Sequence, residues 1–136
     1  MAVRLDHIGI LVRDLDAAMP FYRDVAGLGE PIRRDVPELG LRLAFFDAGD
    51  WPLVELVEFS GTGELAHGDV VVALEVDDLD AALADWRAKG CRVFDQPATD
   101  NLPLRRGWVL KRDGHGTVIE LCPRGAVARF VRGAKG

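Results

Sequence analysis

The alternation of apolar and polar residues predicts a strand almost at the start of the chain. In residues 3–12, Ile8 and Ile10 would lie on one face of an extended segment, and His7 and Gly9 on the other. The apolar face of such a strand normally packs against a helix or a second layer. We therefore expect the side chain of His7 to face away from the first helix.

A helix is expected after this strand, because apolar residues recur at helical spacing up to about Leu28. Asp14 or Asp16 would cap its first turn. Pro20 removes a helical hydrogen bond, so the first turn is expected to be irregular. Three further strands, separated by turn residues, are expected near 31–35, 41–47 and 53–59.

The second half of the chain predicts the same order of elements. These are a strand at 70–76, an Asp-capped helix at 78–89, and strands near 91–95, 105–112 and 117–122. Residues 3–22 also align with residues 67–86 at a shift of 64, with identical pairs such as Asp14/Asp78 and Leu15/Leu79. Two copies at this spacing indicate two supersecondary units packed together.

These patterns predict an α+β protein made of two tandem βαβββ modules, with a mostly antiparallel sheet and the helices outside it. One domain is expected over residues 1–136. Its parts would be module one at 1–60, a linker at 61–69, module two at 70–123 and a basic C-terminal tail at 124–136.

Composition and charge exclude several classes of protein. No stretch approaches the roughly 18 apolar residues of a membrane span, and the net charge of −5 argues against nucleic acid as a partner. The strand pattern begins too early for a signal peptide, and Cys91 and Cys122 form no spaced motif, so we expect a reduced, cytoplasmic protein. The basic tail after Pro123 could attract phosphate, but a solvated, partly frayed end is favoured.

Three polar residues are candidates for chemistry. Glu55 and Glu120 lie at equivalent positions of the two halves, each within an otherwise apolar strand. A carboxylate is costly there unless it is paired, protonated, solvated or bound to a metal. His7 lies on the first strand, and its counterpart in the second half is Val71. Each residue alone is compatible with a structural role, but the repeated positions favour one shared site.

The segment LDHIGILVRDLDAAMPFYRDVAGL, the paired βαβββ order and the closing DGHGTVIEL resemble the vicinal oxygen chelate superfamily. Its members include glyoxalase I, extradiol dioxygenases, methylmalonyl-CoA epimerase and the bleomycin- and fosfomycin-resistance proteins. The resemblance covers about residues 3–123, and VPELGLRLAFFDAGDWPLVELVEF is most similar to the methylmalonyl-CoA epimerase branch. It implies a cup-shaped sheet and a homodimer.

The resemblance also implies a divalent metal whose ligands would be His7, Glu55, Glu120 and the residue at the position of Val71. Imidazole and carboxylate ligands suit Zn, Co, Ni, Mn or Fe. The chain departs from the family pattern twice. Val71 cannot bind a metal, and the acid/base carboxylate expected after the Pro-Glu-x-Gly loop falls on Leu43.

The two other histidines are not expected to complete this ligand set. His67 lies four residues before Val71, roughly 13 Å away along a strand. His115 is expected in a solvent-facing hairpin turn. Neither histidine would therefore replace the missing ligand.

Two mechanisms stay open at this point. In the first, His7, Glu55 and Glu120 hold a metal and water fills the fourth place. In the second, no metal binds, the two carboxylates repel each other, and the raised pKa of one of them makes an acid/base pair with His7.

The resemblance favours an isomerase, epimerase or lyase that acts next to a carbonyl of a small molecule or acyl thioester. One alternative is a ligand-sequestering protein of the resistance type, and another is a natural-product tailoring enzyme such as a cyclase. Aromatic residues would line the cup of a sequestering protein, with Phe45, Phe46, Trp51, Phe94 and Trp108 as the candidates.

Overall fold

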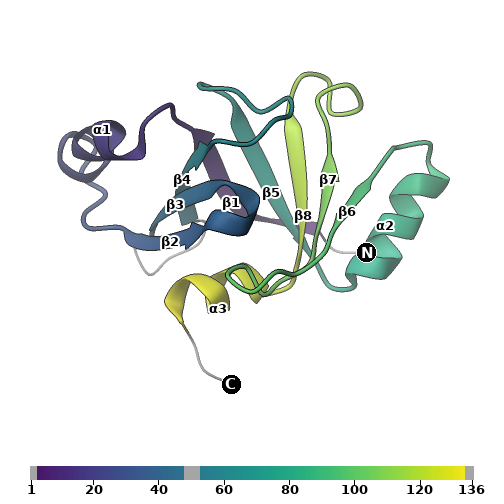
Figure 1. Cartoon of the computed structure of the whole chain (residues 1–136). Helices are drawn as coiled ribbons and strands as arrows, with labels where there is room; N and C mark the ends of the chain where they lie inside the picture. The colour runs from purple at the N-terminus through teal and green to yellow at the C-terminus, as the bar shows by residue number, and fades with distance from the viewer. Residues whose placement is uncertain (1–2, 48–52, 134–136) are drawn as a thin grey trace.

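The computed structural model of the protein describes residues 3–47 and 53–133. Within these residues the strands form one curled sheet in the order β2-β3-β4-β1-β5-β8-β7-β6 (Figure 1). The strands are β1 (Val3–Leu11), β2 (Ile32–Val36), β3 (Leu41–Phe46), β4 (Leu53–Phe59), β5 (Val70–Val76), β6 (Phe94–Gln96), β7 (Arg106–Val109) and β8 (Val118–Pro123). The helices are α1 (Leu15–Pro20), α2 (Leu79–Ala88) and α3 (Ala126–Arg132), with short helical turns at η1 (Phe21–Val25) and η2 (Pro37–Leu39).

The two halves of the chain build the two halves of this sheet. Strand β1 pairs in parallel with β4, and β5 pairs in parallel with β8, whereas the other pairs are antiparallel. Strands β1 and β5 join the modules, with His7 opposite Ala73 and Gly9 opposite Val71. This register is symmetric, because a shift of 64 relates His7 to Val71 and Gly9 to Ala73. The α+β class and the tandem βαβββ order are confirmed.

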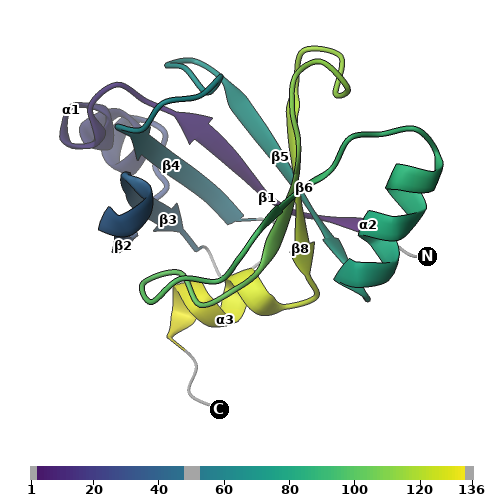
Figure 2. The same cartoon turned by 45° about the vertical axis from the view of Figure 1, so that its right-hand side comes forward.

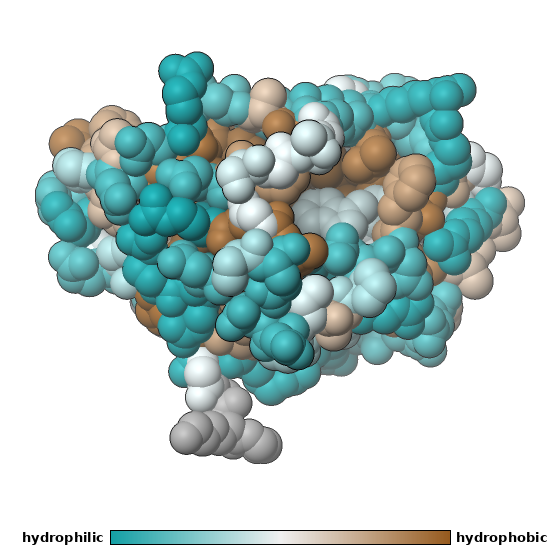
Figure 3. Space-filling view, in the orientation of Figure 1, coloured by the Kyte–Doolittle hydropathy of each residue, from teal (hydrophilic) through white to brown (hydrophobic). Residues whose placement is uncertain are grey.

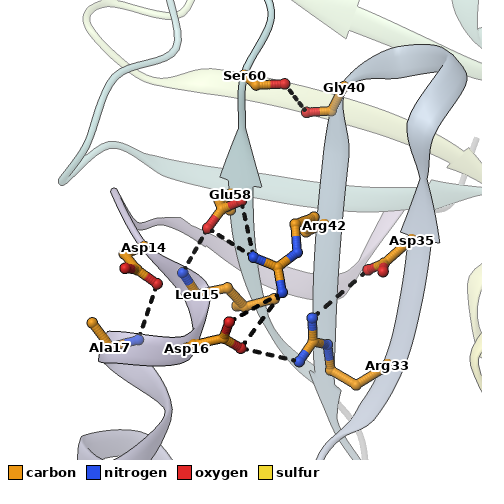
Figure 4. A network of polar contacts seen from close by, with 10 residues as sticks. All are labelled: Asp14, Leu15, Asp16, Ala17, Arg33, Asp35, Gly40, Arg42, Glu58 and Ser60. Atoms are coloured by element: carbon orange, nitrogen blue, oxygen red, sulfur yellow. Dashed lines mark hydrogen bonds and ion pairs between the residues drawn. The ribbon is translucent and has the colours of Figure 1, made fainter.

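The first turn of helix α1 is capped by Asp14 and is bonded to the sheet through Glu58. Asp14 Oδ1 accepts a hydrogen bond from the N–H of Ala17 at 3.1 Å. Glu58 on β4 accepts another from the N–H of Leu15 at 2.9 Å (Figure 4). Arg42 on β3 pairs with the same Glu58 carboxylate at 3.3 Å. The N-terminal turn of α1 is thus fixed to β3 and β4.

The first helix is shorter than the sequence pattern predicted, and the irregularity lies in a different place. Pro20 has no N–H to donate, and α1 ends there. The chain continues as the π-helical turn η1, in which the N–H of Ala26 bonds to the carbonyl of Phe21 at 2.8 Å. The irregular turn therefore follows Pro20, instead of preceding it at the start of the helix.

Helices α1 and α2 cover the same face of the sheet over two separate apolar clusters. Leu15 of α1 packs with Leu56 of β4, and Leu83 of α2 packs with Leu121 of β8. All four side chains are at most 1% exposed. No helix among residues 3–47 and 53–133 is long and apolar enough to cross a bilayer.

The C-terminal segment folds as a helix, so the expectation of a solvated, frayed tail is wrong for residues 126–132. Val127 and Val131 are buried one turn apart and join the apolar cluster on the opposite face from α1 and α2 (Figures 1 and 2). Arg34 on β2 donates hydrogen bonds to the carbonyls of Phe130 and Val131, at 3.4 and 2.9 Å. These bonds satisfy carbonyls that a helix end leaves free.

Candidate active site

The inner face of the sheet and α3 enclose a cavity of about 300 Å³. Its walls are mainly Leu, Val and aromatic side chains from both modules. Apolar side chains are visible in the hollowed middle of the molecule, bordered by hydrophilic residues (Figure 3). Polar groups also line it, from His7, Glu55, Gln96, Arg106 and Glu120. An apolar cavity with a few convergent polar groups is typical of a small-molecule site.

His7 reaches this cavity from an irregular point of β1. Leu5 pairs with Leu74 and His7 pairs with Ala73, so Asp6 is an extra residue in the strand. This bulge allows two consecutive side chains to point inward, and Asp6 and His7 are 0% and 2% exposed. Regular alternation would have placed Asp6 on the outer face.

Asp6 fixes the orientation of the His7 ring. Its Oδ2 lies 2.5 Å from His7 Nδ1, which leaves Nε2 facing the two glutamates. Nε2 is 3.3 Å from Glu55 Oε1 and 3.4 Å from Glu120 Oε1. The structure thus brings together the three residues that the sequence singled out.

Gly9 provides the space for the carboxylate of Glu55. The two residues are partners across β1 and β4, and a Cβ atom at Gly9 would lie 3.0 Å from Glu55 Oε1. A larger residue there would therefore displace the carboxylate. The side chain of Glu55 is 12% exposed, compared with 5% for Glu120, so Glu55 is the more accessible of the two.

Arg106 is a second cation of the site, and the sequence analysis missed it. It points inward from β7 and is 7% exposed. Its Nη1 donates a hydrogen bond to Glu120 Oε2 at 3.1 Å, and its guanidinium carbon lies 5.1 Å from the ring centroid of Trp108. The alternation Arg106-Gly107-Trp108 is the signal that could have placed this arginine on the same face as the tryptophan.

The carboxylates around His7 keep its ring protonated. Burial alone would lower the pKa of His7, but hydrogen bonds to Asp6, Glu120 and Glu55 raise it well above 6.5. His7 is therefore an imidazolium at neutral pH. Burial raises the pKa of Asp6 above 3.8, against the lowering effect of His7.

Glu120 is held in its charged form. Burial would raise its pKa, but the hydrogen bond from His7 and the charge of Arg106 lower the pKa to about 2. The expectation that repulsion would raise the pKa of one carboxylate is wrong for Glu120. The two cations have a larger effect on Glu120 than the neighbouring carboxylate has.

The residues present do not fit a resident divalent metal, although their polar atoms converge. Among residues 3–47 and 53–133, no group of three or more His, Cys, Asp and Glu side chains is arranged to hold a metal ion. Val71, at the position of the fourth expected ligand, lines the cavity as an apolar side chain. The second oxygen of Glu120 is bound by Arg106. The chain therefore places a guanidinium and an imidazolium beside the carboxylates.

The other positions raised by the sequence lie as follows. Leu43 is buried in the cavity wall, so this position offers no acid/base group. His67 lies outside the cavity, where its Nδ1 accepts a hydrogen bond from the N–H of Arg13 at 2.9 Å. His115 is exposed in the turn between β7 and β8. Neither histidine completes the ligand set.

The aromatic residues that the sequence analysis named as candidates for the cavity wall do not all lie there. Phe45 and Trp108 line the cavity. Phe46 instead packs in the cluster under α1, and Phe94 is 51% exposed. Trp51 lies outside the described residues. Of the four candidates that lie within the described residues, two therefore belong to the walls of the site.

Paired βαβββ modules around an apolar cavity that a few polar side chains also line are the architecture of one class of enzymes and binding proteins. The sequence model of the Glyoxalase/Bleomycin resistance protein/Dioxygenase superfamily matches residues 6–103. The chain belongs to this superfamily, as its resemblance indicated.

Several relatives are epimerases or lyases. Mitochondrial methylmalonyl-CoA epimerase of Bos taurus is 29% identical over 109 residues, which cover 70% of this chain and 59% of the relative. A probable lactoylglutathione lyase of Synechocystis is 31% identical over 123 residues, which cover 85% of this chain and 91% of the relative. The chain thus spans less than two thirds of the length of the bovine epimerase.

Solved structures of epimerases are similar to this chain over about nine tenths of its length. A variant of Streptomyces coelicolor methylmalonyl-CoA epimerase in complex with 2-nitronate-propionyl-CoA has a TM-score of 0.70 at 31% identity, covering 88% of this chain and 96% of the other. The Mycobacterium tuberculosis methylmalonyl-CoA epimerase has a TM-score of 0.70 at 27% identity, covering 92% and 91%.

Proposed function

We propose that the protein is an epimerase- or lyase-type enzyme that moves a proton on the carbon next to a carbonyl group. Its substrate is a small apolar molecule or acyl thioester. The observation that carries the proposal is the convergence of Glu55, His7 and Glu120 in a cavity with apolar walls. The kinship with epimerases and a probable lyase supports it.

Glu55 is the base in this proposal, because its carboxylate is the more accessible one. It removes the proton from the carbon next to the carbonyl, and the electron pair of the broken C–H bond moves to the carbonyl oxygen, which gives an enolate. Protonation of the enolate by water on the opposite face of that carbon gives the epimer, and Glu55 then releases the proton that it removed to the solvent. Loss of a leaving group from the neighbouring carbon of the enolate gives a lyase reaction instead.

His7 and Glu120 position this base. Glu120 stays charged, with a pKa of about 2, and faces the His7 imidazolium at 3.4 Å. The imidazolium in turn lies 3.3 Å from Glu55 Oε1 and restrains its carboxylate at the cavity. Asp6 holds the ring from the other side at 2.5 Å.

Exchange of hydrogen with the solvent tests the proposal directly. The protein is incubated in deuterated water with methylmalonyl-CoA and, separately, with an N-acetylcysteamine thioester of a branched apolar acyl chain. Deuterium at the carbon next to the carbonyl is followed by NMR. We expect exchange with at least one probe, and a loss of about a hundredfold or more in Glu55→Gln, which keeps the side-chain shape but removes the base.

Glu30→Gln is the matched control, because the Glu30 side chain is 81% exposed and lies outside the cavity. It should exchange at the wild-type rate. Undiminished exchange in Glu55→Gln would refute the role of Glu55. Binding of either thioester without any exchange would refute the enzyme and favour the sequestering class.

A further inference from the structure

Arg106 offers hydrogen-bond donors to the cavity that the described residues do not use. A guanidinium has five N–H donors, and the hydrogen bond to Glu120 uses Nη1. The Nε atom is buried and has no hydrogen-bond partner in the described part of the chain. A buried donor without an acceptor costs free energy. It therefore indicates an acceptor that a ligand supplies.

The other cation of the site has no free nitrogen. His7 Nδ1 faces Asp6, and Nε2 faces both Glu55 and Glu120. Among the described residues that line the cavity, Arg106 is therefore the cation with donors left for a ligand.

The charges around the cavity indicate the kind of acceptor. The carboxyl groups of Asp6, Glu55 and Glu120 outnumber the cations His7 and Arg106, so a ligand that brought another carboxylate next to them would be repelled. An uncharged carbonyl adds no charge. When Glu55 takes up a proton, the negative charge that it loses reappears on the carbonyl oxygen.

We propose that Arg106 binds the carbonyl oxygen of an apolar ketone, ester or thioester and stabilises the enolate that forms there. This inference rests on the proton transfer proposed above and narrows its substrate to one without a charge at the reacting end. The C–H bond breaks, an O–H bond forms on Glu55, and the electron pair comes to rest on the oxygen beside Arg106. The positive charge that a metal would supply at this oxygen comes from the guanidinium.

Binding of 4-nitrophenol tests the proposal without turnover, because its phenolate carries an enolate-like charge and absorbs differently from the phenol. We expect the wild-type protein to take up the neutral phenol, to transfer its proton to Glu55 and to hold the phenolate at Arg106, so that the pKa of the bound phenol lies below that of the free phenol. Arg106→Gln should weaken phenolate binding by about 10- to 100-fold and leave the bound probe in its neutral form.

Arg105→Gln is the matched control, because Arg105 pairs with Asp80 and Asp95 outside the cavity. It should bind phenolate as the wild type does. Arg106→Lys keeps a cation near Glu120 if Arg106→Gln fails to fold, and the loss of the planar donor group should weaken binding at least about fivefold. The inference would be overturned if the wild-type protein bound only the neutral phenol or did not bind the probe. It would also be overturned if either Arg106 variant bound the phenolate as tightly as the wild type does.

The exchange assay separates this inference from the proposed function. We expect Arg106→Gln to slow exchange about a hundredfold. The control Arg105→Gln should exchange at the wild-type rate, and its thermal unfolding midpoint should equal that of the wild type. Exchange that needs Glu55 but not Arg106 would refute the role of Arg106 and keep the function. Phenolate binding that needs Arg106, in a protein that exchanges no probe, would support the anion site and refute the proton transfer.

Discussion

Glu120 is a buried carboxylate whose charge depends on its two cationic neighbours. Burial would raise its pKa, but His7 and Arg106 lower it from 4.5 to about 2. A carboxyl group with a lowered folded-state pKa contributes its full stability above the unfolded value of 4.5. That contribution is lost as the pH falls from 4.5 towards 2.

Glu120→Gln should therefore show a pH-dependent loss of stability. Above pH 5 we expect the variant to unfold with a free energy roughly 3 kcal/mol below that of the wild type, since the charged partner of His7 and Arg106 is gone. The difference should shrink as the pH falls below 4.5, and below about pH 2 the two proteins should converge. Urea unfolding at a series of pH values measures the difference, and a difference that does not change with pH would contradict the role given to Glu120.

Some residues of the site could be predicted from the sequence, and others could not. Glu55 and Glu120 stood out because a charge in an apolar strand is costly, and because the repeat placed them at equivalent positions. Asp6 was missed because strict alternation puts it on the opposite face from His7, and a bulge reverses this. Arg106 was missed because its partner Glu120 is 14 residues away and the pairing of β7 with β8 brings them together.

At the scale of elements, most strands were predicted closely, but the expected strand at 91–95 overlaps β6 only at residues 94 and 95, and α3 was missed. The strand pattern depends on local alternation, and the expected 53–59 and 70–76 coincide with β4 and β5. The C-terminal segment was interpreted from its positive charge. The spacing of Val127 and Val131 already indicated a helix with one apolar side, because residues four apart share a helix face.

Helix α3 contributes to stability through the side that packs on the sheet. Val131 is 0% exposed in the central cluster. Val131→Ala should lower the free energy of unfolding by about 2 kcal/mol, from the lost burial of two methyl groups and the cavity left behind. Arg129→Ala, on the exposed side of the same helix, is the control and should change it little. Chemical denaturation measures the free energy of unfolding of both variants. Equal values would show that the packing of α3 on the sheet does not stabilise the protein.

At the scale of the whole molecule, the duplicated architecture is symmetric but its site is not. Gly9 and Ala73 are small residues at equivalent positions, next to Glu55 and Glu120 on the neighbouring strands. The two modules depart from this symmetry at His7 and Val71. One module has an imidazolium at this position, and the other has an apolar side chain. The homodimer implied by the family resemblance stays a prediction.

Restoring the symmetry tests whether the fold still holds the geometry of a metal site. Val71 faces Gly9 across β1 and β5 and lines the cavity, so Val71→His would add a second imidazole on the side of Glu55. We expect this variant to bind Co²⁺ near one ion per chain, with visible absorption typical of nitrogen and oxygen ligands. The wild type and Val71→Leu should retain far less metal after dialysis.

The competition between metal and protons gives this prediction a second readout. A metal on His7 Nε2 must displace the proton shared with Glu55 and Glu120, so Co²⁺ binding by Val71→His should release protons and weaken as the pH falls. Near-stoichiometric metal in the wild type, lost in Glu120→Gln, would show that three ligands suffice and that the lost histidine is dispensable. Failure of Val71→His to bind Co²⁺ at any pH would instead show that Arg106 holds Glu120 too firmly for a metal to enter, because the added imidazole would then complete the expected donor set without effect.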